Sequence, residues 1–141
     1  MIIRTMRDED LPQVAELVCS LVPYWEVSEY FVQQRYEEIK ASGNQVVYVA
    51  EKDGEVLGTV TAILCYAMGG NFLAVEDLVV KDSCQRMGVG KALMEQVDKL
   101  ALEKGCTYTM LCSSGFREGA HRFYESMGYN DSVRGFRKLY I

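Results

Sequence analysis

A short glycine-rich segment is the part of this sequence whose residue types and spacing best fit ligand binding. The segment QRMGVGK covers residues 85–91 and lies between an apolar stretch and a long amphipathic one. Glycines let a backbone approach a ligand closely, and a helix start adds unpaired N–H donors and partial positive charge. These features predict a phosphate-binding loop made of Gln85, Arg86, Met87, Gly88, Val89, Gly90 and Lys91.

Two common phosphate-binding patterns do not fit this segment. A Walker loop that used Lys91 would need Gly at Gln85 and Ser or Thr at Ala92. A dinucleotide-binding GxGxxG that started at Gly88 would need Gly at Leu93. What remains is Q-x-x-G-x-G, which a plain glycine-rich helix start would also show.

Two adjacent carboxylates, Glu76 and Asp77, precede the loop within the stretch FLAVEDLVV, residues 72–80. This stretch is predicted to be a strand, in which side chains alternate between the two faces. Alternation places Glu76, Leu78 and Val80 on one face and Asp77 on the other. Only one of the two carboxylates is then expected to face a given cleft.

Composition narrows the class of protein. The chain has 141 residues, a hydrophobic content of 49% and only 2 prolines, which fits one folded domain over residues 1–141. Its net charge is −5, so we expect neither a nucleic-acid partner nor a membrane partner, since both require a basic face. No apolar run reaches the ~18 residues of a membrane span. The start MIIRTMRDED lacks the pattern of a signal peptide, and we expect a cytoplasmic protein.

The cysteines do not predict a metal centre. They number five, form no CxxC pair, and are accompanied by a single histidine, His121. A metal site needs several ligands, so no metal is expected and the cysteines are interpreted as small hydrophobic side chains.

Hydrophobic periodicity and turn residues predict the elements that would position these groups. Helices are expected at residues 8–21, 28–42, 88–104 and 117–127, and strands at 2–6, 45–51, 55–65, 72–80, 106–112 and 133–141. Asp53 and Gly54 predict a tight hairpin between the second and third strands. The order β-α-α-β-β-β-α-β-α-β indicates an α/β (α+β) fold, with a mixed central sheet flanked by about four helices.

Acidic residues are concentrated in the first part of the chain. Residues 1–55 hold 11 acids and 5 bases, whereas residues 56–141 hold 9 acids and 10 bases. This asymmetry suits a cationic partner, although uneven surface solvation explains it equally well.

Two stretches, AVEDLVVKDSCQRMGVGKALM (residues 74–94) and AHRFYESMGY (residues 120–129), resemble motifs of the GNAT superfamily of acetyl-CoA-dependent N-acyltransferases. The first resembles the family's strand, Q/R-x-x-G-x-G/A loop and long helix, and the second its A-x-x-F-Y-x-x-x-G-F/Y segment. Both lie in the family's order and separation. The resemblance implies a GNAT fold and extends to small-amine acetyltransferases such as the aminoalkylphosphonate and spermidine/spermine types.

The resemblance also implies roles for individual residues. Backbone amides from Arg86 to Lys91 would hold the coenzyme A pyrophosphate, and the backbone of Leu78 and Val80 would pair with the pantetheine arm. Tyr124 would protonate the departing thiolate, and Glu76 would accept a proton from the amine or orient it. The acceptor pocket would include Tyr24, Trp25, Glu26 and Glu29, which lie where family members build that pocket. A place in the hydrophobic core explains the two aromatic residues equally well.

The chain departs from the family at one position. Many members carry Asn three residues before the Ala of A-x-x-F-Y, where this chain has Arg117. Ser113 or Ser114 would supply the missing polar contact; Ser114 and Arg117 are expected at the coenzyme site.

The resemblance therefore implies transfer of an acetyl group from acetyl-CoA to the primary amine of a small, cationic molecule, by direct attack in a ternary complex. A protein or peptide N-acetyltransferase and a non-catalytic acyl-CoA sensor remain as alternatives. Family precedent favours a homodimer, and a monomer is left open.

Overall fold

The computed structural model describes residues 1–21, 27–113 and 118–140. The chain divides into two units, Met1–Met110 and Leu111–Ile141. The first unit contains the sheet and three of the helices, and the second contains the remaining helix.

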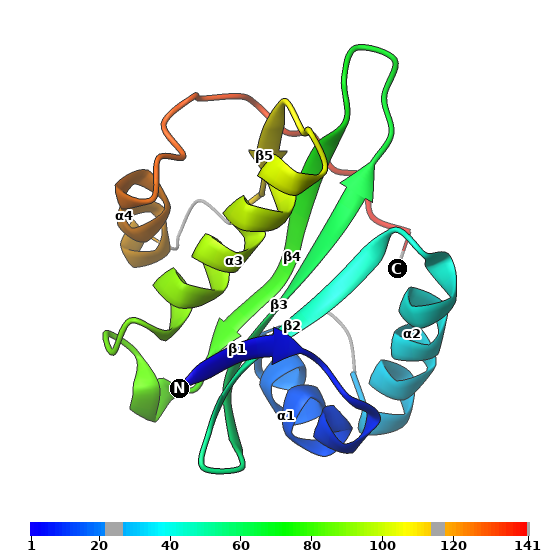
Figure 1. Ribbon diagram of the computed structural model, residues 1–141, viewed down its shortest axis with the longest axis vertical. Coiled ribbons are helices and arrows are strands. Elements are labelled where there is room, and N and C mark those ends of the chain that lie inside the picture. The colour runs from blue at the N-terminus through cyan, green and yellow to red at the C-terminus, as the bar shows by residue number, and fades with distance from the viewer. Residues whose placement is uncertain (22–26, 114–117, 141) are drawn as a thin grey trace. The chain divides into compact units, whose positions relative to one another are not determined.

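The first unit is built on a five-stranded sheet in which the spatial order of the strands follows the chain order (Figure 1). The strands are β1 (Ile2–Thr5), β2 (Gln45–Lys52), β3 (Glu55–Cys65), β4 (Phe72–Val80) and β5 (Tyr108–Met110). The first four pair antiparallel and β5 pairs parallel to β4, so the sheet is mixed as predicted.

Helices cover both faces of this sheet. The helices α1 (Leu11–Leu21) and α2 (Glu29–Ser42) lie on one face and α3 (Val89–Glu103) on the other. Short 3-10 turns precede α1 at Asp8–Asp10 and α3 at Asp82–Cys84, and α4 (Glu118–Ser126) belongs to the second unit.

The second helix begins and ends where its sequence predicts. The Ser28 side chain accepts a hydrogen bond of 3.1 Å from the Phe31 amide, which caps α2. Gly43 follows the helix with φ +74, the left-handed conformation that a glycine adopts at little cost.

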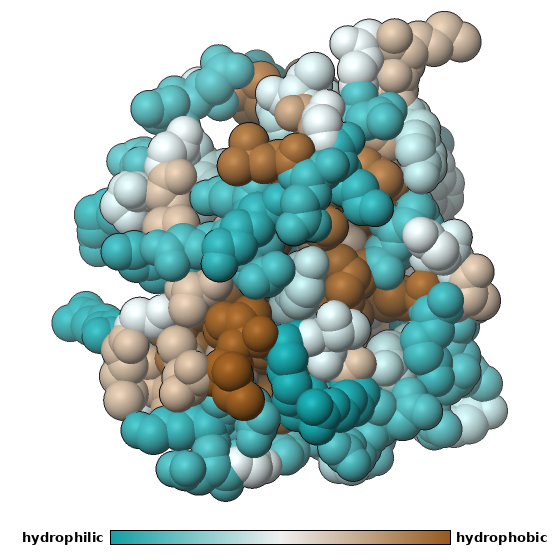
Figure 2. All heavy atoms as spheres, in the orientation of Figure 1, coloured by the Kyte–Doolittle hydropathy of each residue, from teal (hydrophilic) through white to brown (hydrophobic). Residues whose placement is uncertain are grey.

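Apolar side chains fill the space between helices and sheet on both faces. Val14 and Leu17 of α1 and Tyr36 of α2 pack with strand residues Val47 and Val49. On the α3 face, Val89, Leu93, Met94 and Val97 are buried. In the view of Figure 2 hydrophilic side chains cover most of the surface, with apolar side chains in small patches between them.

A buried ion pair joins β1 to the turn before α1. The Asp10 carboxylate accepts hydrogen bonds from the Arg4 guanidinium at 2.7 and 2.9 Å and from the Arg7 amide at 2.7 Å. Arg4 also lies 3.2 Å from Glu51 of β2, so one guanidinium ties three segments together. This pairing lowers the pKa of Asp10.

Most predicted elements are confirmed, including the hairpin at Asp53 and Gly54, but the expected final strand is wrong. Residues 133–140 form neither helix nor strand, although they alternate apolar and basic side chains. A strand requires a neighbour for its backbone groups, and none of the described strands is paired with this segment. The strand expected at 106–112 is also shorter, at Tyr108–Met110.

None of the helices in the described part of the chain is both long enough and apolar enough to cross a membrane.

Candidate active site

The predicted phosphate-binding loop is a compact turn between β4 and α3. The Gln85 side chain donates a hydrogen bond of 3.2 Å to the Asp82 carboxylate, and the Cys84 amide donates one of 2.8 Å to the Lys81 carbonyl. Arg86 and Gly88 both have left-handed backbones, with φ of +64 and +81. Successive turns of this kind direct backbone amides toward a shared centre, as anion-binding nests do.

Helix α3 begins at Val89, directly after Gly88. The first amides of a helix have no partner within it, so those of Val89, Gly90 and Lys91 are available to an anion. A Cβ on Gly88 would have no atom within 4 Å, so space beside the turn is open. Met87 is 64% exposed, and the Lys91 side chain is exposed with its amine 3.8 Å from Glu95. The turn therefore offers backbone donors with open space beside Gly88, the features that an anion site requires.

Gly58 of β3 allows the start of α3 to lie close to the sheet. A Cβ on Gly58 would lie 3.0 Å from Cγ1 of Val89, 3.2 Å from Cδ1 of Leu93 and 3.0 Å from the Val79 carbonyl oxygen. Val89 and Leu93 are themselves buried. The loop is thus held by close packing at its helical end.

Strand β4 is paired with β5 along only part of its length. The parallel pairs are Phe72 with Tyr108, Leu73 with Thr109 and Ala74 with Met110. In the described part of the chain no strand pairs with Glu76–Val80 on that side. An amide-bearing ligand arm could add to this edge as a further strand does. The stretch includes Leu78 and Val80, the two residues predicted to pair with pantetheine.

A β-bulge lies in β4 at Asp77 and Leu78, directly after Glu76. Thr61 pairs with Glu76 and Thr59 pairs with Val79, so Asp77 and Leu78 together oppose the single residue Val60. Asp77 has φ +53, a left-handed conformation.

The bulge corrects the prediction that the two carboxylates face opposite sides of the sheet. Cross-strand partners share a face, so Glu76 lies on the same side as Thr61. Thr61 and Asp77 both line a pocket on the α1 and α2 side. Of the two carboxylates, only Asp77 lines that pocket, and Glu76 is exposed beside it. Strict alternation fails because one extra residue is inserted into the strand.

The protein environment raises the pKa values of both carboxyl groups. Partial desolvation raises the pKa of Glu76, and the neighbouring charge of Asp77 raises it further. Desolvation alone raises the pKa of Asp77. A carboxylate with a raised pKa is a stronger proton acceptor than an ordinary one, which suits general-base chemistry.

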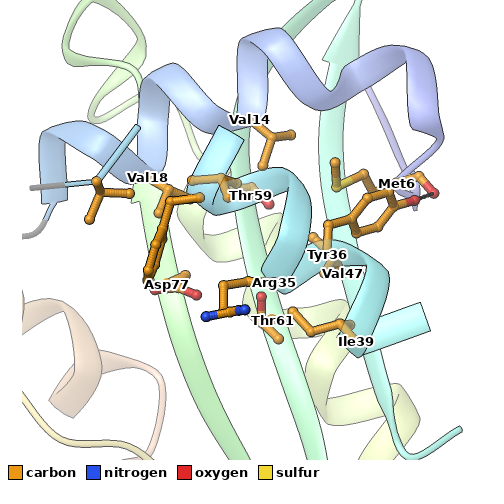
Figure 3. Close-up of a pocket in the computed structure, with 13 residues that line it drawn as sticks. Met6, Val14, Val18, Arg35, Tyr36, Ile39, Val47, Thr59, Thr61 and Asp77 are labelled. Carbon is orange, nitrogen blue, oxygen red and sulfur yellow. Dashed lines mark hydrogen bonds between the residues drawn. The ribbon is translucent and has the colours of Figure 1, made fainter. Parts of the chain in front are cut away.

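The pocket lies between α1, α2 and the sheet and has a volume of about 160 Å³. Its walls are mainly apolar, as Figure 3 shows for Val14, Val18, Tyr36, Ile39 and Val47. Its polar lining consists of Arg35, Thr59, Thr61 and Asp77. Such an apolar cavity with a few converging polar groups is the usual form of a small-molecule site.

Tyr124, the predicted acid, lies on α4 in the second unit. Its ring contacts those of Phe123 and Tyr129, with centroids 5.4 and 6.1 Å away. The Tyr129 amide donates a hydrogen bond of 3.0 Å to the Tyr124 carbonyl, which fixes the end of the helix. The role of Tyr124 as an acid remains a prediction.

Several predicted residues lie outside the described part of the chain. These are Tyr24, Trp25 and Glu26 of the expected acceptor pocket, and Ser114 and Arg117 of the expected coenzyme site. Glu29 is described: it is the first residue of α2 and is exposed, and it is not among the described residues that line the pocket.

Sequence reasoning missed the four polar side chains that line the pocket: Arg35, Thr59, Thr61 and Asp77. Asp77 was assigned to the other face by alternation, and no sequence pattern signals a bulge at this position. The only available signal was that the Glu76-Asp77 pair interrupts an otherwise apolar strand. In the described residues no three His, Cys, Asp or Glu side chains are grouped as metal ligands.

Comparison with known proteins gives one family. The model of the acetyltransferase (GNAT) family matches residues 11–129. A Drosophila melanogaster protein named "Probable glucosamine 6-phosphate N-acetyltransferase" is 30% identical over 139 residues, 92% of this chain and 60% of the relative. The chain thus spans less than two thirds of that relative's length.

A second relative and a solved structure match over nearly their whole lengths. The aminoalkylphosphonate N-acetyltransferase of Salmonella typhimurium is 25% identical over 138 residues, 96% of this chain and 89% of the relative. The crystal structure of glucosamine-6-phosphate N-acetyltransferase from Arabidopsis thaliana superposes with a TM-score of 0.84 at 22% identity, covering 99% of this chain and 98% of that one. This structural likeness shows a shared fold.

Proposed function

Because the chain belongs to the acetyltransferase (GNAT) family, we propose that it is an N-acetyltransferase acting on the primary amine of a small molecule that is cationic at that amine. Acetyl-CoA, when bound, supplies the acetyl group as a thioester. Both substrates bind together, and the amine attacks directly without an acylated cysteine.

The observation that carries the proposal is the course of β4. Beyond Ala74 the strand has no partner on its β5 side within the described residues. It carries Glu76 and Asp77 along that stretch and continues into the turn before α3. One strand thereby links a carboxylate pair to the amides of Arg86 to Lys91 that would hold the pyrophosphate. Leu78 and Val80 lie between them, where their backbone would pair with pantetheine.

Two side chains have proposed roles in proton transfer. An amine of pKa ~10.4 is almost fully protonated at neutral pH, so a proton acceptor is needed. Glu76 takes this proton directly or through a water molecule. The freed nitrogen then forms a bond to the acetyl carbonyl carbon as the carbon–sulfur bond breaks, and the Tyr124 hydroxyl gives its proton to the departing thiolate. The nitrogen, still one proton in excess, loses that proton through water to the Tyr124 phenolate, and Glu76 releases its own proton to solvent.

The remaining predicted contacts belong to the same proposal. Ser114 and Arg117 would contact the coenzyme, and Tyr24, Trp25, Glu26 and Glu29 would surround the acceptor. The names of the two relatives, for glucosamine 6-phosphate and for an aminoalkylphosphonate, support an amine acceptor. The family match extends to both sides of the boundary at Met110, which supports residues 1–141 acting as one domain.

The test is thiol release from acetyl-CoA by the purified chain with polyamines, amino acids, aminoalkylphosphonates, amino sugars and aminoglycosides as acceptors. Tyr124→Phe and Glu76→Gln should each lower kcat by about 10² or more, because each removes one proton-transfer group. Coenzyme affinity should stay within about twofold in both. Matched controls are Tyr66→Phe and Glu103→Gln, which change exposed side chains outside the site.

Other outcomes of this assay would favour one of the two alternative functions. Acetylation of peptides with no small amine accepted would make the chain a protein or peptide acetyltransferase. Tight coenzyme binding without transfer to any small amine or peptide would indicate an acyl-CoA sensor.

A further inference from the structure

The pocket between α1, α2 and the sheet brings two opposite charges to one apolar space. Asp77 enters from β4 and Arg35 from α2, and both side chains are drawn at the pocket in Figure 3. Val14, Val18 and Ile39 form apolar walls between the helices and the strands. Any acceptor that fills this space meets a carboxylate and a guanidinium.

Asp77 faces the pocket without a counter-ion from any of the described residues. Among the described residues no hydrogen bond or ion pair engages its carboxylate, and desolvation alone perturbs its pKa. A carboxylate in apolar surroundings is costly unless it is paired. An ammonium group of a bound molecule would supply that pair.

Arg35 is held in place but keeps hydrogen-bond donors. Its guanidinium lies over the Phe31 ring, 5.0 Å from the centroid, and donates one hydrogen bond of 3.1 Å to Glu38. A guanidinium has five N–H donors in a planar fork, which suits a carboxylate or a phosphoryl group. Within the described part of the chain, Arg35 and Asp77 do not form an ion pair with each other.

Thr61 adds a third polar group to the lining of the pocket. It is 5% exposed, lines the pocket, and its hydroxyl has no hydrogen-bond partner among the described residues. The neighbouring Thr59 hydroxyl instead donates a hydrogen bond of 3.0 Å to the Tyr48 carbonyl. Thr61 can therefore give or accept a hydrogen bond from a bound acceptor.

We propose that this pocket selects an acceptor that carries an anionic group as well as its amine, with the ammonium beside Asp77 and the anion, a carboxylate or a phosphoryl group, on Arg35. This inference rests on the proposed function and deepens it, because it names the acceptor class of the same site. Diamines place a second cation beside Arg35 and are disfavoured. Simple alkylamines leave the Arg35 donors unsatisfied and bind more weakly.

The test compares acceptors of equal chain length that differ in one terminal group: aminoalkyl carboxylates, aminoalkylphosphonates, alkylamines and diamines. Transfer is measured for the wild-type chain, Arg35→Gln, Arg35→Lys and Asp77→Asn, and acceptor binding is measured by calorimetry with coenzyme A present. Arg7→Gln is the matched control, since Arg7 is an exposed arginine outside the pocket.

Arg35→Gln should raise KM for the anionic amines about tenfold or more, because a charge-assisted hydrogen bond is lost. KM for alkylamines should change little. Arg35→Lys should restore part of the preference for anionic amines over alkylamines. Asp77→Asn should weaken binding of every amine, and Arg7→Gln should leave KM and acceptor binding unchanged. The carboxylate and phosphonate series decide which anion the site prefers.

Three results are decisive, and they overturn this inference alone, the proposed function alone, or both. Transfer to diamines or alkylamines in preference to anionic amines, or an unchanged preference in Arg35→Gln, overturns this inference and leaves the proposed function standing. Binding of anionic amines that depends on Arg35, without any transfer, overturns the proposed function alone. Neither binding nor transfer with any acceptor overturns both.

Discussion

Gly58 of β3 and Val89, the first residue of α3, are in such close contact that a Cβ on the glycine would lie 3.0 Å from Cγ1 of the valine. The same Cβ would lie 3.0 Å from the Val79 carbonyl oxygen of β4. The glycine therefore sets the distance between the sheet and the helix start that would receive the pyrophosphate.

Gly58→Ala should push the start of α3 away from the sheet. Overpacking of a tight site typically costs about 1 to 3 kcal/mol, and the free energy of unfolding in urea should fall by that amount. Coenzyme affinity should weaken as well, because the helix amides move with α3. Gly69→Ala is the control: a Cβ there meets no atom within 4 Å, so both quantities should stay unchanged. Equal stability of the two variants would contradict this account.

Gly88→Ala should separate backbone strain from ligand binding. Gly88 and Gly43 have similar left-handed backbones, with φ of +81 and +74, and a Cβ on either meets nothing within 4 Å. Alanine in that conformation costs about 1 to 2 kcal/mol, so Gly88→Ala and Gly43→Ala should lose similar stability. Only Gly88→Ala should weaken coenzyme A binding in calorimetry. The expected loss of affinity is about tenfold, which corresponds to one charge-assisted hydrogen bond. If Gly88→Ala and Gly43→Ala bound coenzyme A equally well, the pyrophosphate would have to bind elsewhere.

The pH dependence of transfer should report the Glu76-Asp77 pair. Glu76 must be ionised to accept a proton, so kcat/KM should rise as the pH increases through its raised pKa. The charge of Asp77 raises that pKa, so Asp77→Asn should move the acidic limb of the profile to lower pH. Glu76→Gln should remove the limb and lower the rate by about 10². A limb that stays in place in Asp77→Asn would show that another group titrates.

Asp10 should contribute pH-dependent stability. Its pKa is lowered in the folded state, so its contribution is complete above its unfolded pKa of about 3.9 and is lost as the pH falls through the folded value. Asp10→Asn should cost about 3 kcal/mol at neutral pH, because it leaves the Arg4 guanidinium short of a partner. The loss should shrink in urea titrations below about pH 4.

The control for Asp10 is Asp8→Asn. Asp8 also forms an ion pair, 3.0 Å from Lys40, but its side chain is 80% exposed. Exposed pairs contribute about 0 to 1 kcal/mol, so the stability of Asp8→Asn should nearly match that of the wild-type chain at every pH. A large loss in Asp8→Asn would show that exposure is a poor guide here.

Local signals in the sequence predicted the elements that depend on local chemistry. Asp53 and Gly54 have φ of +52 and +80, as a tight hairpin requires, and Ser28 caps α2. The turn before α3 follows from its glycines and from the helix start. Such features depend on a few neighbouring residues, so a single sequence contains them.

Features that depend on distant partners could not be predicted in this way. The bulge at Asp77 exists only relative to Val60 of β3, and Arg35 reaches the pocket only because α2 packs on the strands. Residues 133–140 have the alternation of a strand, but no strand in the described part of the chain pairs with them. The acceptor side of the site was therefore the part least visible in the sequence.

The additional residue in β4 serves the pocket and is not needed by the core. If Asp77 were deleted, Glu76 would still pair with Thr61 and Val79 with Thr59, and one residue would oppose Val60. Leu73 and Val75, now 0% and 5% exposed, would keep their faces, because their partners on β3 would be unchanged. Deletion would therefore remove the carboxylate from the pocket and leave the register of the strand intact, so the inserted position can change with the ligand while the core stays the same.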